Sequence, residues 1–458
     1  MLQSLKSIGC FFENAVKMPA LLTERLADPR ARRRVSKRIF TDCLLVFVLC
    51  AVGGLLLWRQ GVALPLWWAW PLLAANAGLA CLLELMSASP FLLRLVLAIQ
   101  VGGQLCQAGL GASLKTVYIR EAVFVVAVVL GLMLFYLLSH LPAWIILWGN
   151  TVVSALVYAL LLATPAKNGS HLAFHGIAVT ELVPRTLGIV SVTYALTQPQ
   201  KSDTERLRNG FMILLAHCTA LAIANDLAPA LLLCITFLAT AVLTQRSVRP
   251  LTFVCCMGGA GGCVAWSLIT ALHGKINLLG MIYTKVTNRV TAVFHAEQLD
   301  PAGAGYQSNQ ALRQLYRCNW ITASDFPALH LPEADTDYVL ISAARFFGLW
   351  IILAIMVGWA LVLIITLLKS RNLIGFHSML ACSAALMLTA QAILNVAMCC
   401  NLFATIGVTL PLWSRGNSSI LTTGILLSFL LAATSGVQPA TAVEMTEDGI
   451  FTTEEVFE

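Results

Sequence analysis

The side chains best suited to chemistry are carboxylates in one polar stretch of an otherwise apolar chain. Residues 297–307 read EQLDPAGAGYQ, and Glu333, Asp335 and Asp337 follow toward the far end of the same polar region. Carboxylates at the two ends of one loop can act as general bases or bind cations. The alternative interpretation is a solvated loop rim without chemistry.

The Gly-Ala-Gly run after Asp300 permits a tight turn that would present this carboxylate, although a lone GxG is a weak phosphate-binding signal. The spacing of His295, Glu297 and Asp300 matches no strong metal template, so no metal site is expected from these three side chains.

The rest of the chain is built for lipid. Of its 458 residues 59% are hydrophobic and 11% charged, and apolar runs long enough to cross a membrane recur along it. Backbone groups in lipid must be satisfied within the segment, so we predict helices, and the runs lack the alternation of a β-barrel. The net charge of +7 gives no reason to expect a nucleic-acid partner, and most of the 14 cysteines fall in apolar runs, which argues against a disulfide framework.

We predict an all-α polytopic membrane protein with about twelve transmembrane helices. A basic arm occupies 1–40, the membrane domain 41–437, a long loop 273–338 within it, and an acidic tail 438–458. The loop carries enough aromatic residues to form short helices. The twelve expected spans are 41–58, 66–86, 90–111, 121–140, 144–163, 175–196, 210–225, 227–244, 250–272, 339–368, 374–399 and 418–437.

Basic residues set the expected orientation. Arginines and lysines between 30 and 38 precede the first span, and the positive-inside rule places them in the cytoplasm. An even number of spans returns the C-terminus to the same side. Basic residues near 201–208, 246–249 and 369–371 then also fall inside, and the loop 273–338 falls outside.

Ionisable residues within spans are costly and mark candidate functional positions. Glu84 and Arg94 lie near span ends, where snorkelling explains them, and Arg345 falls early in the span 339–368. Glu181 and Arg185 are one helical turn apart and could form an ion pair that is either structural or functional.

Asp226 in NDLAPA has a strong structural alternative, since it could cap the helix that follows.

Several motifs in order resemble the SEDS proteins, the RodA, FtsW and SpoVE family of bacterial cell-wall polymerases. DPAGAGYQ at 300–307 resembles the family's DPxGxGYQ, PEADTDYVL at 332–340 its PExxTDF, and 391–419 its Gln-x-x-x-Asn span followed by an LP motif and a Ser-Ser pair. Thr180-Glu181 and Asn225-Asp226-Leu227-Ala228 resemble two further motifs. The resemblance covers about 165–437 and implies a ten-helix core, which leaves an additional N-terminal pair.

The resemblance implies a peptidoglycan glycosyltransferase that polymerises lipid II on the outer membrane face beside a class B penicillin-binding protein. Asp300 matches the essential loop aspartate and would be the catalytic base. Arg289, with Lys275 or Lys285, would bind pyrophosphate, helped by a divalent cation, Mg²⁺. The other implied substrate-binding residues are Tyr306, Gln307, Glu333 and Asp337. The expected structural polar core comprises Glu181, Arg185, Asp226, Gln391, Asn395, Ser414, Ser418 and Ser419.

Departures from the family pattern keep two other functions open. Arg345 replaces an acidic pair, and Arg415 interrupts the serine-glycine motif. A flippase for lipid-linked precursors would suit the buried ionisable residues. A non-catalytic scaffold of the division or elongation machinery would suit the altered motifs.

Overall fold

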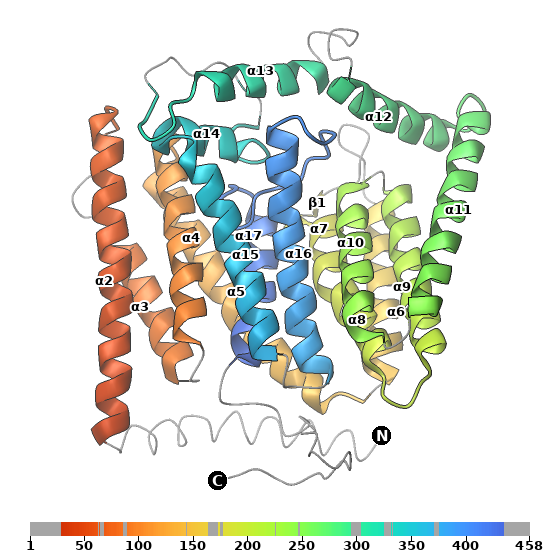
Figure 1. The fold of residues 1–458 in the computed structure, drawn as a ribbon, viewed down its shortest axis with the longest axis horizontal. Coiled ribbons are helices and arrows are strands. Elements are labelled where there is room, and N and C mark those ends of the chain that lie inside the picture. The colour runs from red at the N-terminus through yellow and green to blue at the C-terminus, as the bar shows by residue number, and fades with distance from the viewer. Residues whose placement is uncertain are drawn as a thin grey trace.

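The computed structural model is a bundle of roughly parallel helices with two further helices lying across one end (Figure 1). It describes residues 29–62, 64, 68–85, 89–142, 144–163, 173–174, 177–224, 226–245, 248–294, 304–324, 331, 333–370 and 375–434. Asp300, the predicted catalytic residue, lies outside these ranges, as do most of the N-terminal arm and the acidic tail.

The elements follow one another with short connections. The first half contains α2 (Pro29–Arg59), α3 (Trp70–Leu85), α4 (Pro90–Gly109), α5 (Leu114–His140), η1 (Ile145–Gly149), α6 (Asn150–Ala163), α7 (Val179–Val183), η2 (Pro184–Gly188), α8 (Ile189–Thr197) and α9 (Asp203–Ile223). The second half contains α10 (Ala228–Thr244), α11 (Val248–Leu272), α12 (Asn277–Phe294), α13 (Ala304–Arg317), α14 (Val339–Phe347), α15 (Trp350–Ser370), α16 (Phe376–Cys399) and α17 (Asn417–Ala433). Two short antiparallel strands, β1 (Ala173–Phe174) and β2 (Ile177–Ala178), precede α7.

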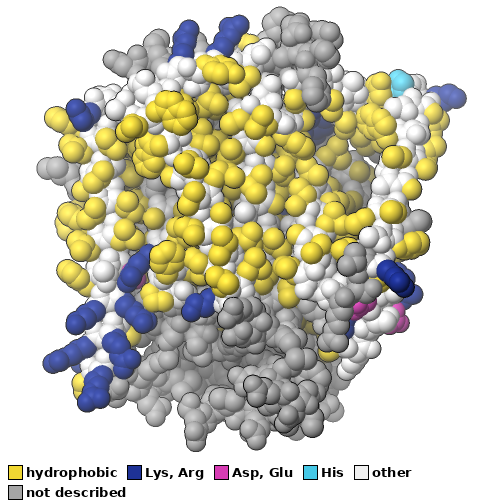
Figure 2. Space-filling model, viewed as in Figure 1, with side chains coloured by type: hydrophobic (Ala, Val, Ile, Leu, Met, Phe, Trp, Pro, Cys, Tyr) yellow, Lys and Arg dark blue, Asp and Glu magenta, His cyan; other side chains and the backbone are white. Residues whose placement is uncertain are grey.

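The bundle has two chemically different ends. We call the end crossed by α12 and α13 the upper face, and the end where α2 begins the lower face (Figure 1). Hydrophobic side chains cover the middle of the visible surface, and Lys and Arg gather at the lower face over the start of α2 (Figure 2). A belt of exposed apolar side chains between two polar ends is the surface expected of a membrane protein.

All twelve predicted segments coincide with helices or consecutive helices. Among the described residues, six helices are long and apolar enough to cross a membrane, namely those within α2, α4, α5, α11, α15 and α16. Four shorter apolar helices lie in α3, η1–α6, α10 and α17. The all-α polytopic fold is therefore confirmed, whereas the number of helices that cross the membrane stays a prediction.

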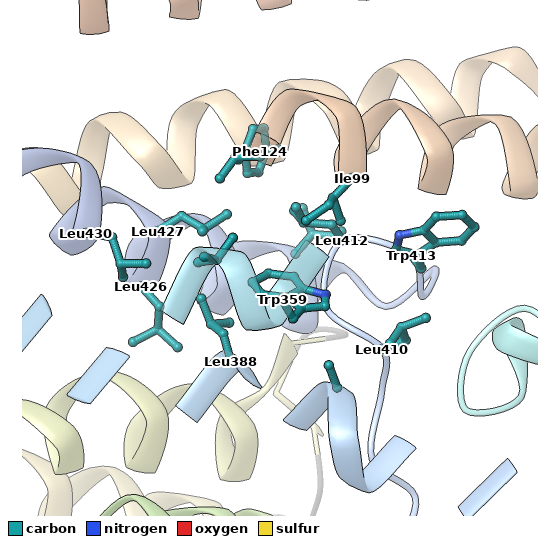
Figure 3. Close-up of a cluster of buried hydrophobic side chains, with 14 of the residues drawn as sticks. Ile99, Phe124, Trp359, Leu388, Leu410, Leu412, Trp413, Leu426, Leu427 and Leu430 are labelled. Atoms are coloured by element: carbon teal, nitrogen blue, oxygen red, sulfur yellow. The ribbon is translucent and has the colours of Figure 1, made fainter. Parts of the chain in front are cut away.

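The core forms where α15, α16 and α17 meet α4 and α5. Trp359 of α15 lies fully buried among Leu388 of α16, Leu426 of α17 and Leu412 (Figure 3). Leu412 belongs to residues 400–416, which we call the re-entrant segment because it turns back from the upper end of α16 into the bundle. Non-helical backbone is tolerated at such depth only where protein surrounds it, and here Val408, Leu410 and Leu412 are at most 1% exposed.

Two sequence predictions need correction. The span 339–368 is not one helix, because Gly348 adopts φ +95° and separates α14 from α15, so Arg345 belongs to a short helix at the upper face. Arg94 does not snorkel alone, since its Nε lies 2.6 Å from Oδ1 of the buried Asp42. The basic residues after Pro29 form the first turns of α2, and the rest of the predicted arm 1–40 lies outside the described residues, so this arm stays a prediction. The side chain of Glu84 lies outside the described part of the chain.

Two helices in the predicted outer loop agree with the expectation of short helices there. α12 and α13 both lie within 273–338, and α13 buries Ser308, Ala311 and Gln314 on the side that packs on the bundle. These helices therefore cover the upper face rather than leaving it open.

Candidate functional site

Charged side chains that are far apart in the sequence come together at the upper face. They influence one another's protonation, which places them within electrostatic reach. We call them the charged cluster: Glu181, Arg185, Asp226, Lys285, Arg289 and Asp337. The fold thus joins the predicted substrate-binding residues to three residues that the sequence assigned to a structural core.

Asp337 is the carboxyl at the centre of this cluster. It lies in the turn 333–338 before α14, outside the long helices, and its side chain is partly buried. Burial, together with the carboxylates of Glu333 and Glu181, raises the pKa of Asp337 to about 7, although the Arg289 cation opposes the shift. Asp337 therefore exchanges its proton in the neutral range, where a group can act as either acid or base.

Two cations face the cluster from α12. Lys285 and Arg289 are four residues apart, which places them on one side of the helix. Burial lowers the pKa of both groups, and the charge of Asp226 counteracts that shift. Two partly buried cations on one helix face form an edge suited to an anion such as a phosphate. Lys275, the other lysine considered, is exposed in the turn between α11 and α12.

Arg185 adds a third cation with unused donors. Its Nη2 lies 3.4 Å from Oε1 of Glu181, so the predicted one-turn ion pair is present. The Arg185 side chain is only 1% exposed, and its Nε and Nη1 have no hydrogen-bond partner among the described residues. Buried donors of a charged group are costly to leave unpaired, which is the property expected of a residue that awaits water or a ligand oxygen.

The capping role considered for Asp226 is wrong. The residue at the N-cap of α10 is Leu227, and among the described residues no side-chain capping bond is present at this helix start. Asp226 instead acts electrostatically on Glu181, Lys285 and Arg289. Its carboxylate is thus available to the charged cluster.

Buried amides hold the turn that carries Asp337. Nδ2 of Asn395 donates to the carbonyl oxygens of Asp337 (2.8 Å) and Val408 (2.6 Å), and Nε2 of Gln391 donates to the carbonyl of Thr409 (2.7 Å). We predicted that these two amides tie spans together. They connect α16 to the re-entrant segment and, through Asn395, to the Asp337 turn.

The three predicted core serines complete this scaffold. Oγ of Ser414 donates to the carbonyl of Thr336 (2.7 Å), and Oγ of Ser419 lies 2.8 Å from Oγ1 of Thr409. Ser418 accepts from the backbone N–H of Ala178 (2.7 Å), which joins α17 to the strand before α7. The serines therefore link the re-entrant segment to the two chain segments that supply Asp337 and Glu181.

Two departures from the family pattern have structural partners. Nη1 of Arg415 lies 2.8 Å from Oδ2 of Asp335, and the Arg415 backbone N–H donates to the Asp335 carbonyl (2.8 Å). Cζ of Arg345 lies 5.8 Å from the centroid of the Phe346 ring, a cation–π contact at the upper face. Both arginines are thus accommodated at the upper face rather than left in apolar surroundings.

The remaining predicted site residues flank the cluster. Tyr306 and Gln307 lie at the start of α13 and are partly buried. Glu333 is exposed, has φ +57°, and accepts a hydrogen bond from Oγ1 of Thr336 (2.5 Å). Asp300 falls between the end of α12 and the start of α13, in residues that the structure does not describe.

Sequence reasoning missed a second buried polar group. Arg120 and Glu121 of α5 are each 2% exposed, and Gln100, Gln104 and Gln107 line one side of α4 beside them. The signal was present in the i, i+4, i+7 spacing of the three glutamines. Arg120 and Glu121 lie where the predicted span 121–140 begins, and charged residues at a span boundary did not stand out as buried.

The described residues contain no group of three or more His, Cys, Asp or Glu side chains placed to hold a metal ion. His295, Glu297 and Asp300, the three side chains weighed as metal ligands in the sequence, lie outside the described residues. A protein-only metal cage is therefore not a feature of the described part of the chain.

Residues 80–437 match the model of the cell cycle protein family that comprises FtsW, RodA and SpoVE. The chain belongs to this family. The match begins well before the region of resemblance at 165–437, so it extends the family likeness into the N-terminal helices. It starts near the end of α3, so α2 and most of α3 precede it.

Curated relatives share part of the chain. It is 34% identical over 161 residues to the probable peptidoglycan glycosyltransferase FtsW of Halorhodospira halophila, which covers 31% of this chain and 38% of the relative. The protein of the same name in Neisseria gonorrhoeae is 31% identical over 178 residues, with 36% and 38% covered. The chain thus spans about two fifths of the length of these relatives.

Solved structures share the fold. One chain of a peptidoglycan synthase complex, solved in a study of coordinated polymerization and crosslinking, superposes with a TM-score of 0.57 at 20% identity, covering 76% of this chain and 98% of that one. A mutant of the rod shape determining protein RodA from Thermus thermophilus gives 0.50 at 17% identity, covering 76% and 97%. At such identities the likeness shows a common architecture.

Proposed function

We propose that this protein is a peptidoglycan glycosyltransferase that polymerises lipid II on the outer face of the bacterial cytoplasmic membrane. Family membership and the names of the relatives support this assignment. The observation that carries it is the charged cluster, in which three cations and three carboxylates meet at the face covered by α12 and α13. Transfer from a lipid-linked pyrophosphate needs cations that stabilise the departing pyrophosphate and a carboxylate that takes the proton of the acceptor hydroxyl.

The cluster suggests how the reaction proceeds. A carboxylate, Asp300 in our proposal, takes the proton of the acceptor sugar hydroxyl as its oxygen attacks the donor's anomeric carbon. The bond from that carbon to the pyrophosphate oxygen breaks, and the lipid pyrophosphate leaves with the electron pair. Lys285 and Arg289 would stabilise the charge that develops on the leaving group, with Arg185 as a further donor. Asp337 would hold Arg289 in place, and it would also take up or release a proton within the site.

Mg²⁺ is proposed as a helper rather than a resident of a protein cage. Mg²⁺ usually binds through one or two carboxylates together with substrate phosphates. Asp337 and Glu333 offer such oxygens, because their charges act on each other at the edge of the cluster. The ion would neutralise pyrophosphate charge when substrate is bound.

A class B penicillin-binding protein is the proposed partner. The fold is shared with one chain of a peptidoglycan synthase complex, and strands made at the upper face must be cross-linked on the same side of the membrane. We further propose that both termini are cytoplasmic, because basic residues of α2 gather at the lower face.

A flippase is less well supported by the position of the charges. A translocation path needs polar groups through the depth of the membrane, whereas the charged cluster lies at the upper face together with α12. The charged groups below the cluster are held by fixed partners. Arg94 lies 2.6 Å from Asp42. Inside the bundle, Glu121 accepts hydrogen bonds from three amides and Arg120 donates to two backbone carbonyls.

Purified protein supplied with lipid II in detergent solution tests the assignment. Detergent removes the two membrane sides, so a flippase has no measurable product whereas a polymerase makes glycan strands. We expect strand formation, increased by the penicillin-binding partner. Lipid II transfer across vesicle membranes without any strand formation in detergent would contradict the proposal.

A further inference from the structure

We propose that Arg120 and Gln107 form a polar clamp that positions the re-entrant segment and the Asp337 turn for catalysis. Neither residue belongs to the charged cluster, and both come from the N-terminal helices α4 and α5. The inference rests on the proposed function for its kinetic consequences. Its structural part, that the clamp holds these two segments, is independent of which reaction the site performs.

The clamp begins with a charged pair buried in apolar surroundings. Arg120 and Glu121 are adjacent on α5 and are each 2% exposed. Placing two charges inside a membrane bundle is costly, and apolar side chains of similar size would pack there at lower cost. A pair retained in such a place therefore needs a purpose beyond stability, and fixing one arrangement of neighbouring segments is such a purpose.

Glu121 is fixed by three amides. Its Oε2 accepts from Nε2 of Gln100 (2.7 Å) and of Gln104 (2.9 Å), and its Oε1 accepts from Nδ2 of Asn76 (3.2 Å). Gln100 and Gln104 belong to α4, and Asn76 belongs to α3. The carboxylate thereby ties α5 to both helices, and Asn76 lies before the residues that match the family.

Arg120 reaches from this anchor to the re-entrant segment. Its Nη2 donates to the carbonyl of Leu412, and its Nη1 donates to the carbonyl of Gly103 on α4 (3.4 Å). Leu412 has φ +65°, a left-handed conformation that is strained for a residue with a side chain. The hydrogen bond from Arg120 holds the carbonyl of this strained residue in place.

Gly103 allows the two backbones to touch. A Cβ at this position would lie 2.2 Å from the Leu412 carbonyl oxygen and 3.0 Å from Cα of Trp413. Both atoms belong to backbone that cannot swing aside. Any larger residue at position 103 must therefore push the re-entrant segment away from α4.

Gln107 carries the connection to the turn of Asp337. Its Nε2 donates to the carbonyl of Trp413 (2.9 Å) and to the carbonyl of Asp335 (3.0 Å). One amide thus bridges the re-entrant segment and the turn two residues before Asp337. Arg120 and Gln107 are positioning residues, because they act on the site through backbone and touch no member of the charged cluster.

The test compares polymerisation rates of three clamp variants with matched controls. Arg120→Met removes the donors, Arg120→Lys keeps one charge, and Gly103→Ala displaces the segment without removing charge. Arg94→Met is the control for the loss of an arginine, because Arg94 on α4 pairs with Asp42 instead. Gly261→Ala is the control for the added methyl group, because no atom lies within 4 Å of a Cβ at this position on α11. The readouts are strand synthesis at saturating lipid II, KM, and amide hydrogen exchange.

We expect Arg120→Met and Gly103→Ala to lower the saturated rate roughly 10- to 100-fold with little change in KM, as for a displacement near 1 Å at the chemistry. Arg120→Lys should recover part of the rate. Exchange should quicken in 408–416 and 333–338 but not in α15. Both controls should behave as wild type.

Unchanged rate and unchanged exchange in Arg120→Met would overturn the clamp. Equal losses in Arg120→Met and Arg94→Met would also overturn it, because they would indicate a general need for arginines that bind buried acceptors in the N-terminal helices. If Arg120→Met does not fold, Gly103→Ala decides the question. If wild type makes no strands, the proposed function fails, whereas the exchange measurement still decides whether the clamp holds the two segments.

Discussion

Burial is the main cause that raises the pKa of Asp337, and its neighbours add to the shift because more of them are negative than positive. Glu333, Glu181 and Asp226 disfavour its charge, and Arg289 alone among the named contributors favours it. A carboxyl in this position stays protonated until a cation arrives or the pH rises. Binding of Mg²⁺ or of a substrate that draws Arg289 closer would change the charge of Asp337, which couples substrate binding to proton release.

Asp337→Asn should remove a titration from the activity profile. The pKa of Asp337 is raised to about 7, so the charged form appears as the pH rises through that value. If the charged form holds Arg289, wild-type polymerisation should increase from about pH 6 to about pH 8, and Asp337→Asn should be slower and flat over this interval. Rates measured across the range check this. An unchanged rising limb in Asp337→Asn would assign the titration to another group.

Asp337→Asn should lower activity, but it should raise stability relative to wild type as the pH rises. Because the folded-state pKa of Asp337 lies above its ordinary value of 3.8, the folded protein holds this proton more tightly than the unfolded chain. That contribution to stability is present at acid pH and is lost as the pH rises through about 7. Thermal unfolding should therefore show Asp337→Asn gaining on wild type between about pH 5 and about pH 8. A gain that shrinks over this interval would contradict the raised pKa.

At the residue scale, spacing along one helix was predictable and contacts between elements were not. The Glu181–Arg185 pair follows from i, i+4 geometry and is present at 3.4 Å. Asp226 looked like a helix cap from its local sequence, but its neighbours are Glu181, Lys285 and Arg289, which no local pattern reveals. The partners of long-range charges depend on packing that only the fold defines.

The re-entrant segment is the element on which the site depends most. It is hydrogen-bonded to α16, α17, α4 and α5, and it lies against the turn of Asp337. At Gly407 this segment approaches the Asp337 carboxyl closely, because a Cβ there would lie 3.2 Å from Oδ2 of Asp337. The φ of Gly407, +68°, also favours glycine. The segment therefore sets both the backbone and the side-chain environment of this carboxyl.

Gly407→Ala should lower activity more than an equally strained control. Gly111→Ala is the matched variant, since Gly111 also has positive φ (+80°) but no atom within 4 Å of an added Cβ. Both substitutions should cost a similar amount of stability from backbone strain, roughly 1 kcal/mol. Only Gly407→Ala should reduce the polymerisation rate, because only it crowds Asp337. Thermal unfolding and strand synthesis measure the two effects, and equal rates in both variants would count against the role of this contact.

Apolar runs predicted the long helices, but they could not predict where a run is broken. The predicted segment 339–368 is continuously hydrophobic around Gly348, yet the chain turns there because residues 319–324 hydrogen-bond the junction of α14 and α15. The re-entrant segment was likewise recognisable only by family motifs. Its buried, irregular backbone is stabilised by Gln391, Asn395 and Ser414, whose partners are distant in sequence.

The whole molecule is polarised between its two faces. Basic side chains of α2 cluster at the lower face, whereas the charged cluster and the covering helices α12 and α13 lie at the upper face. Composition and the positive-inside rule were sufficient to predict this arrangement, because both depend on the chain's average properties. The additional helices α2 and α3 were also predictable as apolar runs, whereas their connection to the site through Asn76 and Glu121 was not.

Cysteine labelling in intact cells tests the proposed orientation. Tyr316 is 85% exposed on α13 at the upper face, and Lys201 lies just before α9 at the lower face. Tyr316→Cys should react with a membrane-impermeant maleimide, and Lys201→Cys should react only after the membrane is opened, since charged reagents do not cross lipid. The reverse pattern would invert the topology and remove the basis for an outward-facing site.

The central claim is our proposal that Asp300 is the carboxylate that performs glycosyl transfer. The most direct measurement is strand synthesis from lipid II by purified wild type and by Asp300→Asn, with Asp203→Asn at the start of α9 as a control for charge removal at the lower face. Loss of a general base costs about 10²- to 10⁴-fold. We predict strands from wild type and Asp203→Asn and almost none from Asp300→Asn. Equal synthesis by Asp300→Asn and wild type would contradict the account.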